Sequence, residues 1–287
     1  MTASIRLLVV DCNIRDDRDA YELAFGQLPG AAYAAAIASV SPGIVYDIAL
    51  PADAGANLPD PAGLAAYDGI VLTGSSLNIY NGGAAVARQI ELMRAIYASR
   101  TPVFGSCWGI QLAAVAAGGV VHKNPRGREV GIARRIVRTA AGAGHPLLDG
   151  RPDTWDAPCS HLDEIAVPPG ETKVLAANAV SGIQAVEIRH DGCVFWGVQY
   201  HPEFTLADIA FIMRGRLQTL VSEGYGASDA ALSAHLDDLE TLDRDPARKD
   251  LGWQLALDAE VLDPIRRRRE LQNFVEQRVK PNRSRRG

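Results

Sequence analysis

The most informative segment of the chain is Val103-Phe104-Gly105-Ser106-Cys107-Trp108-Gly109-Ile110-Gln111-Leu112-Ala113. An apolar strand leads into a Gly-x-Cys-x-Gly turn, and an apolar-periodic stretch typical of a helix follows. Strand, tight turn and helix in this order form a nucleophile elbow, in which Gly105 and Gly109 supply the small residues that the turn requires. The elbow would place the sulfur at the carboxyl edge of a sheet, beside a helix N-terminus that favours thiolate over thiol. We therefore predict that Cys107 is a nucleophile.

The segments around this turn alternate between strand-like and helix-like patterns. Apolar runs at 5–12, 44–50 and 69–72 predict buried strands of the parallel type, and apolar residues at helical spacing predict a helix over 84–99. Between 132 and 198, short strand-like pieces are separated by Gly, Pro and Asp, which indicates antiparallel strands at or beyond one edge of the sheet. We expect an α/β fold with a mostly parallel central sheet, helices on both faces and short antiparallel edge strands.

The composition changes after Gly226. Ala, Leu, Asp and Arg recur at helical spacing there, and helices are expected after the cap at Ser228 and over 262–279. We predict a catalytic domain over residues 1–225 and a helical C-terminal extension over 226–287. The basic residues at the end of this extension are interpreted as a solvated helix face and a frayed terminus, with an acidic partner surface as the alternative.

Charge and cysteine usage exclude several classes of protein. The net charge of -5 gives no general reason to expect a nucleic-acid partner or a membrane surface. The N-terminus lacks the pattern of a signal peptide, and no apolar run approaches the roughly 20 residues that span a bilayer. No Cys-x-x-Cys pair is present, which argues against a zinc site or a disulfide framework. We expect a cytoplasmic protein without a metal or other cofactor; its four cysteines are Cys12, Cys107, Cys159 and Cys193.

A second motif supplies what a cysteine nucleophile requires. The stretch Phe195-Trp196-Gly197-Val198-Gln199-Tyr200-His201-Pro202-Glu203-Phe204 carries a histidine and a carboxylate one residue apart. An imidazole would take the thiol proton and return it to the leaving amine, and a carboxylate would orient that imidazole. We therefore predict the catalytic residues Cys107, His201 and Glu203.

Two backbone N–H groups are candidates for an oxyanion hole. The N–H of Trp108 follows the nucleophile directly, and the N–H of Gly74 lies in the small-residue turn after the strand at 69–72. Both would point to the place where a tetrahedral oxyanion forms.

Gly-Ser-Cys-Trp-Gly-Ile-Gln at 105–111 together with His-Pro-Glu at 201–203 resembles the class I glutamine amidotransferase family, over roughly residues 5–225. Ser160-His161-Leu162-Asp163-Glu164 is similar to a segment of its stand-alone branch of γ-glutamyl peptidases and GMP-synthase-like glutaminases. The resemblance implies the flavodoxin-like amidotransferase fold and hydrolysis of the γ-amide of glutamine or a γ-glutamyl compound through a thioester on Cys107. It also implies that Gln111 contacts the amino-acid end of the substrate and that Ser160 and His161 are substrate-binding. His161 competes as a second candidate base, and its alternative role is to order a loop by hydrogen bonds with Asp163.

Three functions share these motifs. The first is a hydrolase that acts alone on a small γ-glutamyl amide. The second is a glutaminase subunit that delivers ammonia to a synthase partner, since the sequence shows neither a Gly-x-x-x-x-Gly-Lys-Ser/Thr loop nor a Ser-Gly-Gly loop. The third is a non-catalytic binding protein, which the complete triad disfavours. The turn at 73–76 lacks the Gly-Gly-Pro common in GMP synthases, which argues against a nucleotide synthase. A synthase partner or a homodimer is left open.

Overall fold

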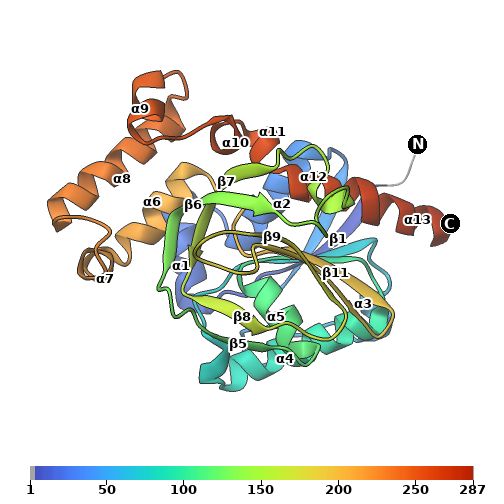
Figure 1. The fold of residues 1–287 in the computed structure, drawn as a ribbon. Coiled ribbons are helices and arrows are strands. Elements are labelled where there is room, and N and C mark those ends of the chain that lie inside the picture. Colours follow the sequence, from blue (N-terminus) through green and yellow to red (C-terminus); the bar gives the residue numbers. More distant parts are fainter. Residues whose placement is uncertain (1–3, 287) are drawn as a thin grey trace.

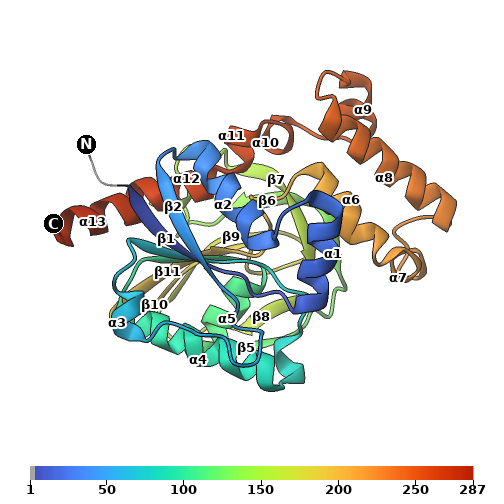
Figure 2. The ribbon, with the colours of Figure 1, turned by 180° about the vertical axis from the view of Figure 1, so that it is seen from behind.

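The computed structural model describes residues 4–286, so Met1, Thr2 and Ala3 of the N-terminal segment and Gly287 of the basic tail lie outside the described residues. The strands of the main sheet are β1 (Ile5–Val10), β2 (Ile44–Ala49), β3 (Gly69–Leu72), β4 (Val103–Ser106), β6 (Glu129–Arg138), β7 (Thr154–His161), β9 (Thr172–Ala177), β10 (Ala185–His190) and β11 (Cys193–Val198). They are ordered β2-β1-β3-β4-β11-β10-β9-β6-β7 (Figures 1 and 2). The half from β2 to β11 is parallel, and the half from β11 to β7 pairs antiparallel. The expected α/β fold is therefore confirmed. A second, two-stranded antiparallel sheet contains β5 (Val120–Lys123) and β8 (Asp163–Val167).

Helices cover both faces of the main sheet. The helices of the described residues are α1 (Arg15–Phe25), α2 (Pro29–Val40), α3 (Pro61–Leu64), α4 (Ala84–Ser99), α5 (Trp108–Ala116), α6 (Leu206–Arg214), α7 (Leu217–Ser222), α8 (Asp229–Arg244), α9 (Lys249–Gln254), α10 (Ala259–Leu262), α11 (Pro264–Arg267), α12 (Arg269–Phe274) and α13 (Lys280–Arg286). Short 3-10 turns η1 (Ile79–Asn81) and η2 (Pro146–Leu148) and a π-helical turn η3 (Val275–Val279) complete the helical elements. The expected helix over 84–99 is confirmed. The prediction of a frayed terminus is wrong for residues 280–286, because these residues form the helix α13. An ion pair between Lys280 and Glu276 at 2.6 Å supports the start of this helix.

In the described part of the chain, no individual helix has both the length and the hydropathy to cross a membrane. The helices α1 and α2 meet these criteria only as a pair, with a bend of 58° between them.

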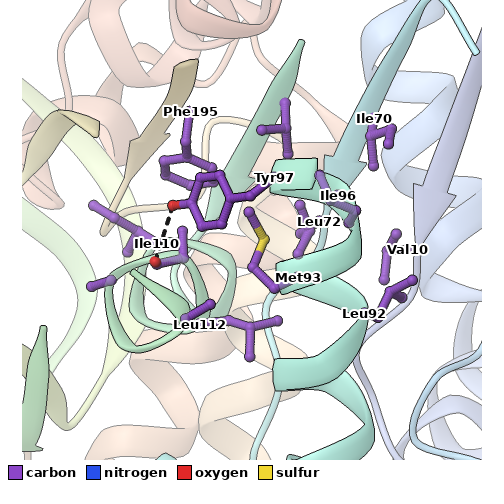
Figure 3. Close-up of a cluster of buried hydrophobic side chains, with 14 of the residues drawn as sticks. Val10, Ile70, Leu72, Leu92, Met93, Ile96, Tyr97, Ile110, Leu112 and Phe195 are labelled. Atoms are coloured by element: carbon purple, nitrogen blue, oxygen red, sulfur yellow. Dashed lines mark hydrogen bonds between the residues drawn. The ribbon is translucent and has the colours of Figure 1, made fainter. Parts of the chain in front are cut away.

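One face of the sheet is covered by α4 and α5. Side chains of β1, β3 and β11 meet Met93, Ile96 and Tyr97 of α4 in a continuous buried cluster (Figure 3). The Tyr97 hydroxyl satisfies its own burial by donating to the Ala113 carbonyl of α5 at 3.0 Å. These contacts fix α5, and therefore the elbow at its start, against the sheet.

The opposite face is covered by two helical segments that are far apart in sequence. Tyr33 and Ile37 of α2 pack there beside Phe274 and Val279 of the α12–η3 segment, which lies along α2 in both views (Figures 1 and 2). The approach is so close at the start of β3 that a Cβ on Gly69 would lie 2.7 Å from Val279 Cγ2. Residues 269–279 therefore form part of the helical layer that covers this face of the sheet.

A third buried cluster joins α6 to α8. Leu232, Leu236 and Leu239 of α8 pack with Ile209 and Met213 of α6 in one buried core. Helix α8 extends beyond the end of the sheet (Figure 1). The division into 1–225 and 226–287 stays a prediction. The two segments share buried cores on two sides of the molecule.

Candidate active site

Cys107 lies at the junction of β4 and α5, at the carboxyl end of the parallel strands. Its backbone has φ 51° and ψ -99°, a strained positive-φ conformation that a non-glycine residue seldom adopts outside functional sites. Its N–H donates to the Val198 carbonyl of β11 at 2.8 Å, which holds the strained turn to the sheet. A Cβ on Gly105 would lie 2.9 Å from Gly109 Cα, so the turn requires these glycines. The elbow has the geometry expected from its sequence.

His201 and Glu203 follow the neighbouring strand β11 and meet Cys107 in one cavity of about 710 Å³. His201 Nδ1 lies 2.6 Å from Glu203 Oε1, and both side chains are buried. The His201 N–H donates to the Pro158 carbonyl at 2.8 Å, which anchors this loop to β7. The structure therefore brings together the three predicted catalytic side chains. Their roles stay predictions.

The charge state of His201 follows from these neighbours. Burial lowers the pKa of His201, but the Glu203 carboxylate and the hydrogen-bonded Cys107 together outweigh it and raise the pKa to about 10. An imidazolium is therefore the stable form at neutral pH, next to the sulfur. This arrangement suits a residue that protonates a leaving amine.

We predict that replacing Glu203 with glutamine moves the alkaline limb of the pH–rate profile to lower pH. In the unmodified enzyme, kcat/KM should fall only as the pH rises through the His201 pKa of about 10. The amide cannot supply the negative charge that raises this pKa, so the proton is lost at lower pH. The measurement is kcat/KM from pH 6 to pH 11 for both proteins. The same alkaline limb in both would contradict the assigned pairing.

Two residues that were not predicted from the sequence, Ser106 and Tyr33, form a hydrogen-bonded chain to the Glu203 carboxylate. The Ser106 hydroxyl donates to Glu203 Oε2 at 3.0 Å, and the hydroxyls of Ser106 and Tyr33 lie 2.8 Å apart. The second carboxylate oxygen is therefore satisfied inside the protein and the rotamer of Glu203 is fixed. The ring of Phe204 stacks on the His201 imidazole at 3.8 Å between centroids, with 5° between planes.

Ser106→Ala should lower kcat by about tenfold, the value expected for one hydrogen bond to a charged group. Ser106 is a positioning residue, because it contacts Glu203 and not the sulfur. KM should change little, while the alkaline limb of the profile should shift, since the carboxylate is no longer oriented. Ser106→Thr, which keeps the hydroxyl, should retain most of both properties. An unchanged pH profile in Ser106→Ala would contradict this role.

The predicted oxyanion-hole residues lie on the two sides of the nucleophile. Gly74 follows β3 and is so close to the imidazole that a Cβ there would lie 2.6 Å from His201 Cε1 and 3.7 Å from Cys107 Cβ. Trp108 begins α5, and its indole donates to Gln89 at 2.7 Å in the core. Within residues 4–286, no intramolecular hydrogen bond uses the N–H of Gly74 or of Trp108. Both donors are free for an oxyanion, and that role stays a prediction.

The three predicted substrate-binding residues are placed differently from one another. Ser160 lines the cavity, and its carbonyl lies 3.6 Å from Cys107 Sγ. Gln111 is buried and donates to the Asp163 carbonyl at 3.2 Å and to Gln199 at 3.3 Å. It does not line the cavity. Substrate contact by Gln111 stays a prediction that this arrangement does not support.

His161 is also turned away from the cavity. Its Nε2 lies 2.9 Å from Glu129 Oε2, and its Nδ1 lies 3.1 Å from the Asp163 carbonyl. This matches the loop-ordering role that was the alternative for His161. The Asp163 carboxylate itself accepts hydrogen bonds from Asn78 and Tyr80, two contacts that could not be predicted from the sequence.

Residues 48–211, more than half of the chain, match the protein family described as glutamine amidotransferase class-I. A gamma-glutamyl-L-1-hydroxyisopropylamide hydrolase from a Pseudomonas species is 40% identical over 223 residues, which cover 77% of this chain and 75% of that protein. GMP synthase (glutamine-hydrolyzing) of Leifsonia xyli subsp. xyli is 36% identical over 135 residues, 47% of this chain. These residues make up only 25% of that synthase.

Among solved structures, a glutamine amidotransferase from Thermotoga maritima superposes with a TM-score of 0.60, covering 96% of this chain and 98% of that chain. Its sequence identity of 15% means that this likeness concerns the fold alone.

Proposed function

This chain belongs to the class I glutamine amidotransferase family, and on that premise we propose that it is a cysteine-dependent hydrolase of γ-glutamyl amides. The observation that carries the proposal is the cavity in which Cys107, the imidazolium of His201 and Glu203 meet. The 40% identical relative, whose name describes a γ-glutamyl amide hydrolase, supports the substrate class.

The geometry accounts for each step of such a hydrolysis. The Cys107 thiolate attacks the γ-carbonyl carbon, and the new oxyanion is bound by the N–H groups of Gly74 and Trp108. His201 gives its proton to the amide nitrogen, so that the C–N bond breaks, the amine leaves and a γ-glutamyl thioester remains. His201, now neutral, takes a proton from water, which attacks the thioester and releases glutamate. Glu203 keeps the imidazole oriented throughout.

A glutaminase subunit with a separate synthase partner would use the same chemistry and differ in the fate of the amine. The test is release of glutamate by the purified protein alone from L-glutamine, a γ-glutamyl dipeptide and a γ-glutamyl alkylamide. We expect turnover of the last two substrates without a partner. Turnover near zero on all three would overturn the proposal for a hydrolase that acts alone.

A further inference from the structure

The cavity that holds Cys107 also holds a cation without a carboxylate partner. Arg216 follows α6, lines this cavity and is partly buried. Its Nη1 lies 3.5 Å from Ser160 Oγ, which is the length of a weak hydrogen bond. Within residues 4–286, no carboxylate lies within 4.0 Å of this guanidinium.

The neighbouring arginines behave differently. Arg214 lines the same cavity, but its guanidinium is held by Glu240 at 3.0 Å and by Asp237 at 2.6 Å. Arg128, whose charge acts on Arg216, is bound by Glu223 at 2.8 Å. Burial and the charge of Arg128 lower the pKa of Arg216. Burying a charge costs free energy unless an opposite charge or a hydrogen-bond partner compensates it. In the described part of the chain Arg216 has no such carboxylate partner, and it lines the cavity.

Ser160 connects this cation to the nucleophile. Its carbonyl oxygen is 3.6 Å from Cys107 Sγ, and its hydroxyl is 3.5 Å from Arg216 Nη1. One residue therefore touches both groups. In an extended γ-glutamyl group, the γ-carbonyl carbon and the α-carboxylate carbon are separated by four C–C bonds, a span of about 5 Å. A ligand of this length can reach from the sulfur towards the guanidinium.

We propose that Arg216 is the residue that recognises a carboxylate of the substrate. This inference rests on the proposed function and names a specificity determinant for it. Arginine binds carboxylates through two parallel hydrogen bonds, which fix orientation as well as charge. Two carboxylates could supply this chemistry: the α-carboxylate of the γ-glutamyl group, and the terminal carboxylate of a leaving amino acid.

Asp17 favours the first source. It also lines the cavity, and its charge acts on Arg216 although it lies outside ion-pair distance. Its carboxylate is held by the Ser76 hydroxyl at 2.5 Å. A cation and an anion on the wall of one cavity match the α-carboxylate and α-ammonium of a γ-glutamyl group.

The experiment compares Arg216→Met, Arg216→Lys and the unmodified enzyme on three substrates. The ethylamide of the γ-glutamyl group carries only the α-carboxylate, γ-glutamylglycine carries a second carboxylate, and N-ethyl-4-aminobutanamide carries none. Arg214→Met is the matched control, since that guanidinium is already neutralised. Loss of one hydrogen-bonded charge contact should raise KM about 10- to 100-fold.

We expect Arg216→Met to raise KM by a similar factor for the ethylamide and for γ-glutamylglycine, with a smaller change in kcat, and to leave N-ethyl-4-aminobutanamide unaffected. Arg216→Lys should recover part of the affinity, and Arg214→Met should leave every KM unchanged. A rise confined to γ-glutamylglycine would assign Arg216 to the leaving amino acid. Equal KM values in Arg216→Met and the unmodified enzyme would overturn the proposal.

A binding measurement separates this inference from the proposed function. Calorimetry with Cys107→Ala and the γ-glutamyl ethylamide, with and without Arg216→Met, reports recognition in the absence of turnover. Absence of hydrolysis with Arg216-dependent binding would overturn the hydrolase and keep the carboxylate site. Hydrolysis together with binding that does not depend on Arg216 would overturn the carboxylate site and keep the hydrolase.

Discussion

Cys107→Ala is expected to lower kcat/KM for γ-glutamyl amides by about 10⁴-fold or more, because the thioester route is lost entirely. The folded state should persist. Cys107 lines the cavity, and its Sγ makes a long contact of 3.6 Å with the Ser160 carbonyl. The measurement is amine release under single-substrate conditions, with circular dichroism to verify the fold. Full activity in Cys107→Ala would end the assignment of the nucleophile.

The other cysteines provide the matched controls. Burial raises the pKa of Cys12 and Cys159 well above the usual value and that of Cys193 to about 12, so these thiols are protonated at neutral pH. Iodoacetamide should therefore alkylate Cys107 first and stop activity in proportion to its incorporation. Cys159→Ala should remain sensitive to the reagent. Equal incorporation into the unmodified protein and Cys107→Ala would contradict the prediction.

Arg151→Met is expected to lower the free energy of unfolding by about 3–5 kcal/mol, the cost of leaving a buried charge without its partner. Arg151 binds both carboxylate oxygens of Glu270 at 2.7 Å and Glu260 at 2.8 Å. Glu270 is fully buried on α12 and also accepts from the Tyr200 hydroxyl at 2.7 Å. Tyr200 directly precedes His201, so this network also ties the catalytic loop to the C-terminal segment.

Chemical unfolding in guanidinium chloride, followed by fluorescence, measures this loss. Arg248→Met is the control, because its ion pair with Asp250 is solvent-exposed and its removal should leave the unfolding midpoint unchanged. The double variant Arg151→Met, Glu270→Leu should recover part of the stability, since the fully buried Glu270 carboxylate is then no longer left without its cation. Equal midpoints for Arg151→Met and Arg248→Met would contradict a structural role for the network.

The sequence predicted best what is encoded locally. The elbow depends on glycines two residues from Cys107, and the His201–Glu203 pair depends on residues one apart, so both could be recognised without the fold. The relay through Ser106 and Tyr33 joins residues 73 positions apart, and only the packing of α2 on β4 creates it. The direction in which a side chain points at the end of a strand could likewise not be predicted from the sequence. Ser160 and His161 are neighbours whose side chains point to opposite environments, because successive residues of β7 alternate.

The C-terminal helices could be predicted as helices, but what they cover could not. Their apolar residues repeat at helical spacing, which identifies a buried face and says nothing about its partner. The structure shows that Phe274 and Val275 complete the same core as Phe104 and Trp196. Gly69 is required there for space rather than for a turn, and a single glycine at the start of a strand carries no such signal in the sequence.

The close fit of Val279 against Gly69 also bears on how the chain is made in the cell. A ribosome that has just completed β11 has already synthesised every strand of the sheet. Helix α2 already covers part of one apolar face, but the part that packs against Leu271, Phe274, Val275 and Val279 lacks its cover until residues 199–270 have been added. During that interval the nascent chain exposes apolar strand surface, and chains in this state are prone to aggregate and are bound by chaperones. The core of this face, and the Tyr200–Glu270 contact beside His201, are therefore completed only after the C-terminal segment has been synthesised.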